Sequence, residues 1–216
     1  MRILIFGATG ATGSQLVDQA LARGHSVTAF VRDPARLTRT HPALLCVAGD
    51  VMDPATVNPA LQGQEAVLCA LGTMPEMKPD LPRRQPQVPV CSIGTRHIID
   101  AMLRHGVRRI VVETSAGIGE SRRTGRFGAA AIIRLLLRDV MADKERQEAT
   151  LRASAVDWTI IRPVRLSDAA RSGRVRCGDA IAWGLLSKIS RADVAAVMLD
   201  CIADAATSKR AITALG

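Results

Sequence analysis

The sequence predicts an α/β fold in which one doubly wound parallel sheet carries helices on both of its faces. Three observations support this prediction. Short apolar runs alternate with stretches of helical periodicity along the chain. The expected strands are almost continuously apolar, which is typical of parallel strands that are covered on both faces. The length of 216 residues suits one domain with a sizeable core and is short for two, so we expect a single domain over residues 1–216.

The expected strands are short apolar runs that end near glycine, proline or a charged residue. They are 3–6, 25–31, 44–47, 66–71, 107–112, 158–161 and 211–213. The expected helices, in which apolar residues recur on one face, are 11–23, 94–105, 129–154 and 191–204. A further short helix begins at Asp53-Pro54, since aspartate caps a helix and proline suits its first turn. Between the expected strand 66–71 and the expected helix 94–105, residues 72–89 hold five prolines and show little periodicity, which is typical of a functional loop.

Composition excludes several classes of protein. With 48% hydrophobic and 23% charged residues, the chain is neither disordered nor collagen-like. The five cysteines form no C-x-x-C pair, which argues against a zinc site or a redox dithiol and suits a reducing compartment. The longest apolar stretch, 129–137, is interrupted by Arg134, and the N-terminus lacks a signal-peptide pattern. We therefore expect a cytoplasmic protein with no bound metal and no membrane partner.

The net charge of +9 has two readings that the sequence leaves open. A basic surface favours anionic partners such as nucleotide phosphates. The excess also fits a general bias toward arginine, because most of the basic residues are Arg. A nucleic-acid partner is not expected, since aromatic residues are only 2% and there is no helix-turn-helix pattern.

A glycine-rich loop joins the first expected strand to the first expected helix. Gly7, Gly10 and Gly13 follow the spacing G-x-x-G-x-x-G within Phe6–Gly13. In a dinucleotide-binding fold, the first glycine makes a tight turn, the second lets a pyrophosphate approach the backbone, and the third lets helix and strand pack closely. The helix N-terminus then offers N–H groups and a partial positive charge to the phosphates. The predicted fold is therefore Rossmann-like.

The end of the second strand indicates which dinucleotide is bound. Arg32 stands where enzymes that select NAD usually carry an acidic residue, and Arg36 follows one helical turn later. Two cations favour the 2′-phosphate of NADP, although a solvated arginine pair is the alternative and Asp33 lies between them. Asp50, at the end of the third strand, is a candidate for the adenine amino group, with a turn or cap as the alternative.

These features together resemble the atypical short-chain dehydrogenase/reductase superfamily, and most closely its biliverdin IXβ reductase/flavin reductase type with the NmrA-like relatives. The segments that carry the resemblance are GATGATG (7–13), FVRDPARL (30–37), GDVMD (49–53), ALGT (70–73), GTRHIIDAMLRHGVRRIVVETSA (94–116), LRASAVDWTIIRP (151–163) and SRADVAAVMLDCI (190–202).

The resemblance implies roles for particular residues. Its cofactor set is Gly7, Thr9, Gly10, Ala11, Thr12 and Gly13 at the pyrophosphate, Arg32 and Arg36 at the 2′-phosphate, Asp50 and Val51 at adenine, and Leu71, Gly72, Thr73 and Pro163 along the ribose and nicotinamide half. Its catalytic pair is Ser115 and Lys144, with Glu148 as the acidic partner of the lysine. Its substrate loops are about 72–90, 115–128 and 164–178.

Alternatives remain for several of these residues. Lys144 and Glu148 are four residues apart, so they also fit a weak surface pair on one helix face. Ser115 also fits a hydroxyl that satisfies a local carbonyl. A basic cluster beyond it, Arg122, Arg123 and Arg126, fits either an anionic substrate or a solvated loop.

The chain departs from the superfamily pattern at two places. Val140 stands where classical members have their catalytic tyrosine, and the chain contains no tyrosine. Pro163-Val164-Arg165 replaces a histidine that flavin-reductase members have after the sixth strand.

The missing tyrosine constrains the reaction. Reduction of a simple ketone needs a protein acid, whereas reduced flavins and quinones take protons from water. We therefore expect an NADPH-dependent oxidoreductase acting on a flavin, a quinone or a related planar conjugated acceptor. The alternative is a non-catalytic NADP-binding regulator of the NmrA-like kind. The expected partner is a small-molecule acceptor, and the chain is expected to be a monomer or small homo-oligomer.

Overall fold

The structure is a computed structural model that describes residues 1–72 and 88–216. Within these residues, a central sheet of eight strands runs in the order β3-β2-β1-β4-β5-β6-β10-β8. Its strands are β1 (Arg2–Phe6), β2 (Ser26–Val31), β3 (Leu44–Ala48), β4 (Ala66–Cys69), β5 (Arg109–Glu113), β6 (Asp157–Pro163), β8 (Arg176–Gly178) and β10 (Arg210–Leu215). All neighbouring pairs are parallel except β8 and β10, which are antiparallel. A separate parallel pair is formed by β7 (Arg165–Ser167) and β9 (Lys188–Ser190).

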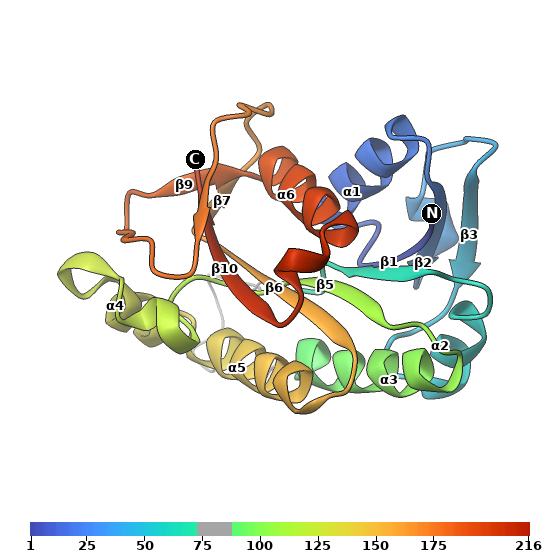
Figure 1. The fold of residues 1–216 in the computed structure, drawn as a ribbon, viewed down its shortest axis with the longest axis horizontal. Helices are drawn as coiled ribbons and strands as arrows, with labels where there is room; N and C mark the ends of the chain where they lie inside the picture. Colours follow the sequence, from blue (N-terminus) through green and yellow to red (C-terminus); the bar gives the residue numbers. More distant parts are fainter. Residues whose placement is uncertain (73–87) are drawn as a thin grey trace, which may run out of the picture.

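Helices cover both faces of the sheet, as Figure 1 shows. On one face lie α1 (Ala11–Ala22) and α6 (Arg191–Ala203); on the other lie α2 (Pro54–Ala60), α3 (Val90–Arg104) and α5 (Arg138–Ala153). A further helix, α4 (Ala129–Leu136), lies at the end of the molecule away from β3 (Figure 1). Short 3₁₀ turns are η1 (Pro34–Arg36), η2 (Gly119–Arg122), η3 (Arg126–Gly128) and η4 (Ala205–Thr207). The doubly wound α/β prediction is confirmed.

The sheet divides the core into two apolar clusters because successive side chains of a strand point to opposite faces. In β1, Ile3 and Ile5 pack toward α1 and α6, whereas Leu4 and Phe6 pack toward α2 and α3. All four side chains are fully buried. Burying each such side chain contributes roughly 1.5–3 kcal/mol to folding, so β1 ties both layers to the centre of the sheet.

The strand order reverses at the centre of the sheet. From β1 the chain moves outward through β2 and β3, and it then returns to β4 on the other side of β1 before it continues through β5 and β6. The carboxyl ends of β1 and β4 therefore border a crevice, which is where ligands bind in open parallel sheets. The glycine-rich loop follows β1 at this place.

Two features of the fold differ from the sequence-based expectation. The helix expected over 129–154 is two helices, because Leu137 has φ −122° and ψ 38°, outside the helical region. Packing against α3 fixes the direction of α5, and the apolar periodicity of 129–137 gave no sign of the break. The sequence also gave no sign of β7, β8 and β9, which are only three residues each. The other strands and helices were predicted to within about two residues of their observed ends, apart from the beginning of α3 and the end of α2, for which no end was predicted.

In the two described stretches, 1–72 and 88–216, we find no helix with the length and apolar character that crossing a membrane demands.

Candidate functional site

The glycine-rich loop forms a narrow cradle at the centre of the sheet. Gly7 has φ +78°, and a Cβ atom there would lie 2.6 Å from the carbonyl oxygen of Ala70, which follows β4. A Cβ atom on Gly13 would overlap the carbonyl of Gly7, so this glycine lets α1 approach the loop. Around Gly10 the space is open: among the described residues, only the carbonyl oxygen of Gly7 comes within 4 Å of a Cβ atom built there, at 3.1 Å.

The N-terminus of α1 faces this open space without a side-chain cap or an acidic residue in its first turn. Gly10 is the N-cap residue and its N–H donates to the carbonyl of Gly7, at 2.9 Å. The N–H groups of the first turn and the helix dipole are therefore available to an anion. This geometry fits the pyrophosphate of a dinucleotide, as the glycine spacing predicted.

The two threonines of the loop differ in their surroundings. The hydroxyl of Thr9 is half-buried and has no hydrogen-bond partner among the residues that the structure describes. The hydroxyl of Thr12 is buried and donates to Oε1 of Glu113, at 3.2 Å. The hydroxyl of Thr12 is thus turned toward β5, and the N–H of Thr12, in the first turn of α1, is the group left for the predicted pyrophosphate contact.

Glu113 is a site residue that the sequence reasoning missed. It ends β5 with a carboxyl that is 6% exposed, directly beneath the first turn of α1. Burial raises the pKa of this carboxyl, while the charge of Lys144 and the hydrogen bond from Thr12 oppose the rise. The available signal was a carboxylate at the end of the apolar run RIVVE, immediately before the Thr-Ser pair.

The two predicted 2′-phosphate residues flank the carboxyl end of β2. Arg32 directly follows β2 and Arg36 lies in η1; both side chains are exposed and neither forms an ion pair with residues in the described ranges. Asp33, between them, accepts a hydrogen bond from the N–H of Ala35 at 3.0 Å. Its carboxylate therefore caps η1, and both guanidinium groups remain available to a phosphate.

Asp50 and Val51 lie at the next strand end, with different exposures. Oδ1 of Asp50 accepts from the N–H of Met52, at 2.9 Å, so one of its oxygens stabilises a turn. The side chain of Val51 is buried, and a Cβ atom on Gly94 would lie 2.7 Å from it. This side chain packs against α3, and the carbonyl oxygen of Val51 lies 2.9 Å from Nδ1 of His97, so the N–H of Val51 is the polar group left for the predicted adenine contact.

Lys144 joins the carboxyl ends of two central strands. Its ammonium donates to the carbonyl of Leu71, after β4, at 3.2 Å and to the carbonyl of Glu113, at the end of β5, at 3.1 Å. The lysine is only 8% exposed, so the reading as a surface pair is wrong. Gly72, the next residue of the predicted set, has open space where a Cβ atom would be, and Thr73 lies outside the described residues.

Asp143, which precedes Lys144, caps α3. Its carboxylate accepts hydrogen bonds from the N–H groups of Cys91 and Ser92, at 2.9 and 3.1 Å, and from the hydroxyl of Ser92, at 2.5 Å. Two consecutive residues of α5 therefore fix the end of β4 and the beginning of α3.

The expected partner of Lys144 is engaged elsewhere. Glu148 binds Arg162 through two contacts, 2.9 and 2.5 Å, and accepts from the hydroxyl of Thr114 at 2.8 Å. Arg162 is fully buried and also contacts Glu120 at 2.8 Å. Burial alone would lower the pKa of Arg162, but its hydrogen bonds and the two carboxylates raise it. Glu148 thus belongs to a buried ion pair below the site, and the Lys144–Glu148 partnership is a wrong expectation.

The remaining predicted residues are Ser115, which follows β5, and Pro163, which ends β6. The hydroxyl of half-buried Ser115 donates to the carbonyl of Ala116 at 3.1 Å, and the N–H of Ala116 donates to the carbonyl of Pro163 at 2.9 Å. Pro163 therefore meets the serine loop through its main chain. In the basic cluster, Arg122 pairs with Glu145, whereas Arg123 and Arg126 are exposed.

A hollow of about 180 Å³ opens between the N-terminal ends of α1 and α6. Ala11, Ser14, Gln15, Asp168, Ala169, Arg191 and Ala192 line it. Arg191 forms an ion pair with Asp168 at 2.5 Å, and its charge is a minor effect that opposes the burial-driven rise in the pKa of Glu113. The sequence reasoning did not single out this arginine, which lies beside the N-terminus of α1.

Comparison with known proteins agrees with this geometry. The model of a family described as NAD(P)H-binding matches residues 7–205. The chain belongs to this NAD(P)H-binding family. The match begins at Gly7 and ends in η4, so it includes the glycine cradle, the arginines after β2 and the lysine of α5.

Several known proteins resemble the chain over much of its length. An uncharacterized chloroplastic protein of Arabidopsis thaliana is 28% identical over 81% of this chain, which spans 62% of that protein. ChuY, an anaerobillin reductase of Escherichia coli O157:H7, has a TM-score of 0.79 at 23% identity and covers 99% of this chain and 96% of its own. A short-chain dehydrogenase/reductase of Veillonella parvula in complex with NADP has a TM-score of 0.77 at 19% identity, covering 99% and 93%.

Proposed function

We propose that the chain is an NADPH-dependent reductase that transfers hydride to a flavin, a quinone or a related planar conjugated acceptor. The observation that carries the proposal is the position of Lys144, whose buried ammonium joins the carboxyl ends of β4 and β5 next to the glycine cradle.

The described residues fit an NADPH molecule. The cradle has open space at Gly10, the first turn of α1 is uncapped, and Arg32 and Arg36 are unpaired among the described residues. When bound, NADPH supplies the hydride. The NADP complex of the Veillonella neighbour supports this choice of cofactor.

The chain's own residues would bind and orient the reactants. Gly10 and the N–H groups of α1 would hold the pyrophosphate, and the arginines after β2 would hold the 2′-phosphate. Lys144 and Ser115 would position the nicotinamide ribose beside the acceptor. Catalysis would then rest mainly on proximity and on the exclusion of water.

The absence of tyrosine determines which acceptors suit the site. Val140, at the place of the classical tyrosine, offers no proton, and the hydroxyl of Ser115 is turned to the carbonyl of Ala116. A flavin or quinone can take its protons from water after hydride transfer, whereas an isolated ketone needs a protein acid in the same step. The neighbour ChuY, which is named as a reductase, supports a reaction of this class.

The experiment is a panel of flavin, quinone and linear tetrapyrrole acceptors with NADPH or NADH, in which cofactor oxidation is followed by near-ultraviolet absorbance. We expect turnover with at least one planar acceptor and a preference for NADPH. Tight NADPH binding without turnover on any acceptor would overturn the proposal and favour an NADP-binding regulator. Fractionation of the source cells would test the prediction of a cytoplasmic location, which the chloroplastic Arabidopsis relative does not share.

A further inference from the structure

An apolar surface lies at the end of the molecule away from β3, on α4 and the loop before β9 (Figure 1). We call it the α4 patch; its exposed residues are Phe127, Ile132, Leu135, Leu136, Leu137, Leu185 and Leu186. Phe127 is 98% exposed, Leu186 is 88% exposed and Leu135 is 78% exposed. Single exposed leucines are ordinary, but a group of this kind marks an interaction surface.

The two parts of the α4 patch are held together by main-chain contacts. The N–H of Arg126 donates to the carbonyl of Trp183 at 2.8 Å, and the N–H of Trp183 donates to the carbonyl of Thr124 at 3.1 Å. The indole of Trp183 is buried and donates to the carbonyl of Ser121 at 2.8 Å. These bonds tie the loop before β9 to the segment that leads into α4, so the two groups of exposed apolar residues lie on adjoining parts of the molecule.

The backbone at Phe127 holds its ring outward. Phe127 has φ 52° and ψ 39°, a left-handed conformation that is uncommon for a bulky residue and costs of order 1 kcal/mol or more. Because the ring is almost fully exposed, packing within the chain does not offset this cost. A partner outside the chain would offset it by burying the ring.

The charges around the α4 patch are mainly positive. Residues 122–138 contain five arginines and no carboxylate, exposed Asp139 follows them, and Lys188 follows the second part of the patch. Arg126 and Arg138 form no ion pair with described residues, while Arg134 and Arg122 share Glu145 of α5. Apolar side chains bordered by arginines are typical of helices that lie at the interface of an anionic membrane.

We propose that the α4 patch docks the chain on the surface of a membrane that contains anionic lipid. Phe127 and the leucines would enter the boundary between headgroups and acyl chains, and the arginines would contact the headgroup phosphates. A second copy of the chain fits less well, because a two-fold contact would place the same arginines against one another. The expectation of no membrane partner rested on the lack of a spanning segment, which surface docking does not require.

The test is co-sedimentation of the whole chain with vesicles of phosphatidylcholine, alone or with roughly one third phosphatidylglycerol. We expect binding to the anionic vesicles, and at least a tenfold weaker partition at about 1 M salt, where the Debye length falls to about 3 Å. Phe127→Ser/Leu135→Ser and Arg126→Glu/Arg138→Glu should each weaken partition by about tenfold or more.

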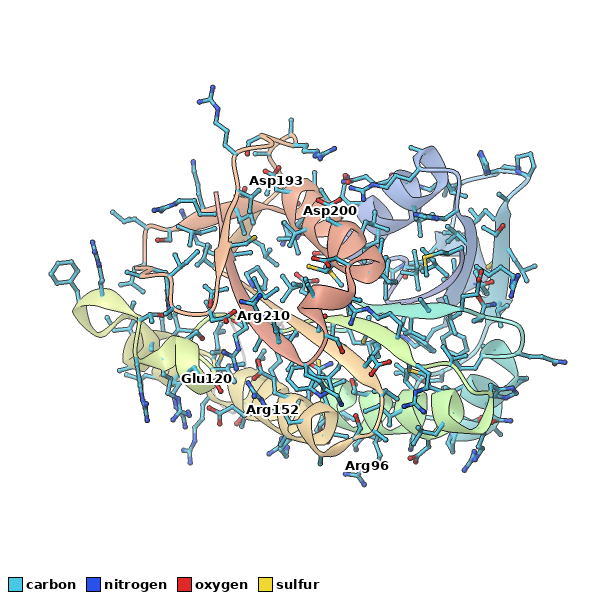
Figure 2. The ribbon with its side chains drawn as sticks, in the orientation of Figure 1. Arg96, Glu120, Arg152, Asp193, Asp200 and Arg210 are labelled. Carbon is cyan, nitrogen blue, oxygen red and sulfur yellow. The ribbon has the colours of Figure 1, made fainter. Side chains whose placement is uncertain are left out.

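Matched controls separate docking from general changes. Leu45→Ser/Leu103→Ser removes two exposed leucines elsewhere. Arg96→Glu/Arg104→Glu makes the same change in net charge on α3, where Figure 2 shows Arg96 pointing away from the body of the molecule. Both controls should bind vesicles like the wild type, and circular dichroism should show all variants folded.

A second readout uses Phe127→Trp, whose emission should shift to the blue on anionic vesicles only. Three results would overturn the proposal: no binding to anionic vesicles, equal losses in the controls, or a dimer in solution that Phe127→Ser/Leu135→Ser converts to monomer. None of these measurements depends on turnover. Failure of the docking proposal can therefore be distinguished from failure of the proposed reductase activity.

Discussion

The carboxyl of Glu113 accepts a hydrogen bond from the hydroxyl of Thr12, at 3.2 Å, and so ties the end of β5 to the first turn of α1. The carboxyl is buried beneath the place where the cradle offers N–H groups to phosphates. A negative charge here opposes an anionic ligand, whereas a protonated carboxyl does not. The charge state of Glu113 therefore affects both the stability of the fold and the binding of the dinucleotide.

Glu113→Gln should change how stability depends on pH. Burial raises the pKa of Glu113 in the folded state above its ordinary value of 4.5, so its contribution to stability is greatest below pH 4.5 and declines as pH rises through the raised value. As pH rises from 4.5 through the raised pKa, the wild type loses stability and the glutamine variant does not. The free energy of unfolding of the variant should therefore increase relative to that of the wild type. Urea unfolding at a series of pH values measures the difference.

Glu65→Gln is the matched control for this experiment. A hydrogen bond from the N–H of Arg2 lowers the pKa of Glu65, so the contribution of this exposed carboxylate is present above its ordinary pKa and lost as pH falls. Its glutamine variant should differ from the wild type with the opposite dependence on pH. A flat difference for Glu113→Gln would contradict the assignment.

Arg32→Ala should remove most of the preference for NADPH. We expect the wild type to bind NADPH at least about tenfold more tightly than NADH, since a charge-assisted phosphate contact is worth about 1.5–3 kcal/mol. Calorimetry with both cofactors measures the ratio. Arg104→Ala, at the far end of α3, should keep it, and equal wild-type affinities for the two cofactors would refute the assignment of Arg32 and Arg36.

Gly10→Val should abolish NADPH binding and leave the chain folded. A side chain at this position enters the open space that we assign to the pyrophosphate, and the φ of Gly10, −76°, is ordinary for any residue. Gly13→Val is the contrast: its side chain would overlap the carbonyl of Gly7, so it should lower the melting temperature. Thermal stabilisation of Gly10→Val by NADPH would show that the phosphates bind elsewhere.

Ser115→Ala and Lys144→Ala should each slow turnover only by about 10–100-fold, because lost positioning costs less than a lost catalytic proton, which is worth about 10²–10⁴-fold. The hydride should reach the acceptor directly, as deuterium at the transferred position of NADPH would show. Efficient reduction of simple ketones, with a basic pKa that disappears in Lys144→Ala, would instead make the lysine a proton donor.

Glu148→Gln should be the most destabilising of these changes. It leaves the buried guanidinium of Arg162 with one carboxylate, and breaking such a pair costs about 3–5 kcal/mol. Glu120→Gln removes the other, largely exposed carboxylate and should cost less than about 1 kcal/mol. Chemical unfolding of both variants compares the costs, and equal values would mean that Glu148 is no more important to Arg162 than a surface partner.

The residues of the cradle were predictable because their spacing is a local property. Gly7, Gly10 and Gly13 lie within one turn and one helix start, and the same local logic identified the arginines after β2. The longer strands of the central sheet were predictable because parallel strands covered on both faces are apolar throughout, whereas β7, β8 and β9 are too short to show a pattern. The break between α4 and α5 at Leu137 was not predictable from the sequence, because it depends on what each of the two helices packs against.

Partnerships between distant residues could not be obtained from spacing. Lys144 and Glu148 are one helical turn apart, yet the lysine is directed to the ends of β4 and β5 and the glutamate to Arg162 on β6. Both contacts depend on the order of the strands. The role of Glu113 was missed for the same reason, because its partner Thr12 is 101 residues away.

Asp143 and Lys144 have a consequence for tolerance to insertion. The first caps the beginning of α3 and the second holds the carbonyl of Leu71, so both sides of residues 73–87 are anchored to consecutive positions of one helix. A change of sequence or length between the anchors would leave Leu71 and α3 where they are. Insertions or deletions between these two anchors should therefore leave the glycine cradle and the end of β4 in place.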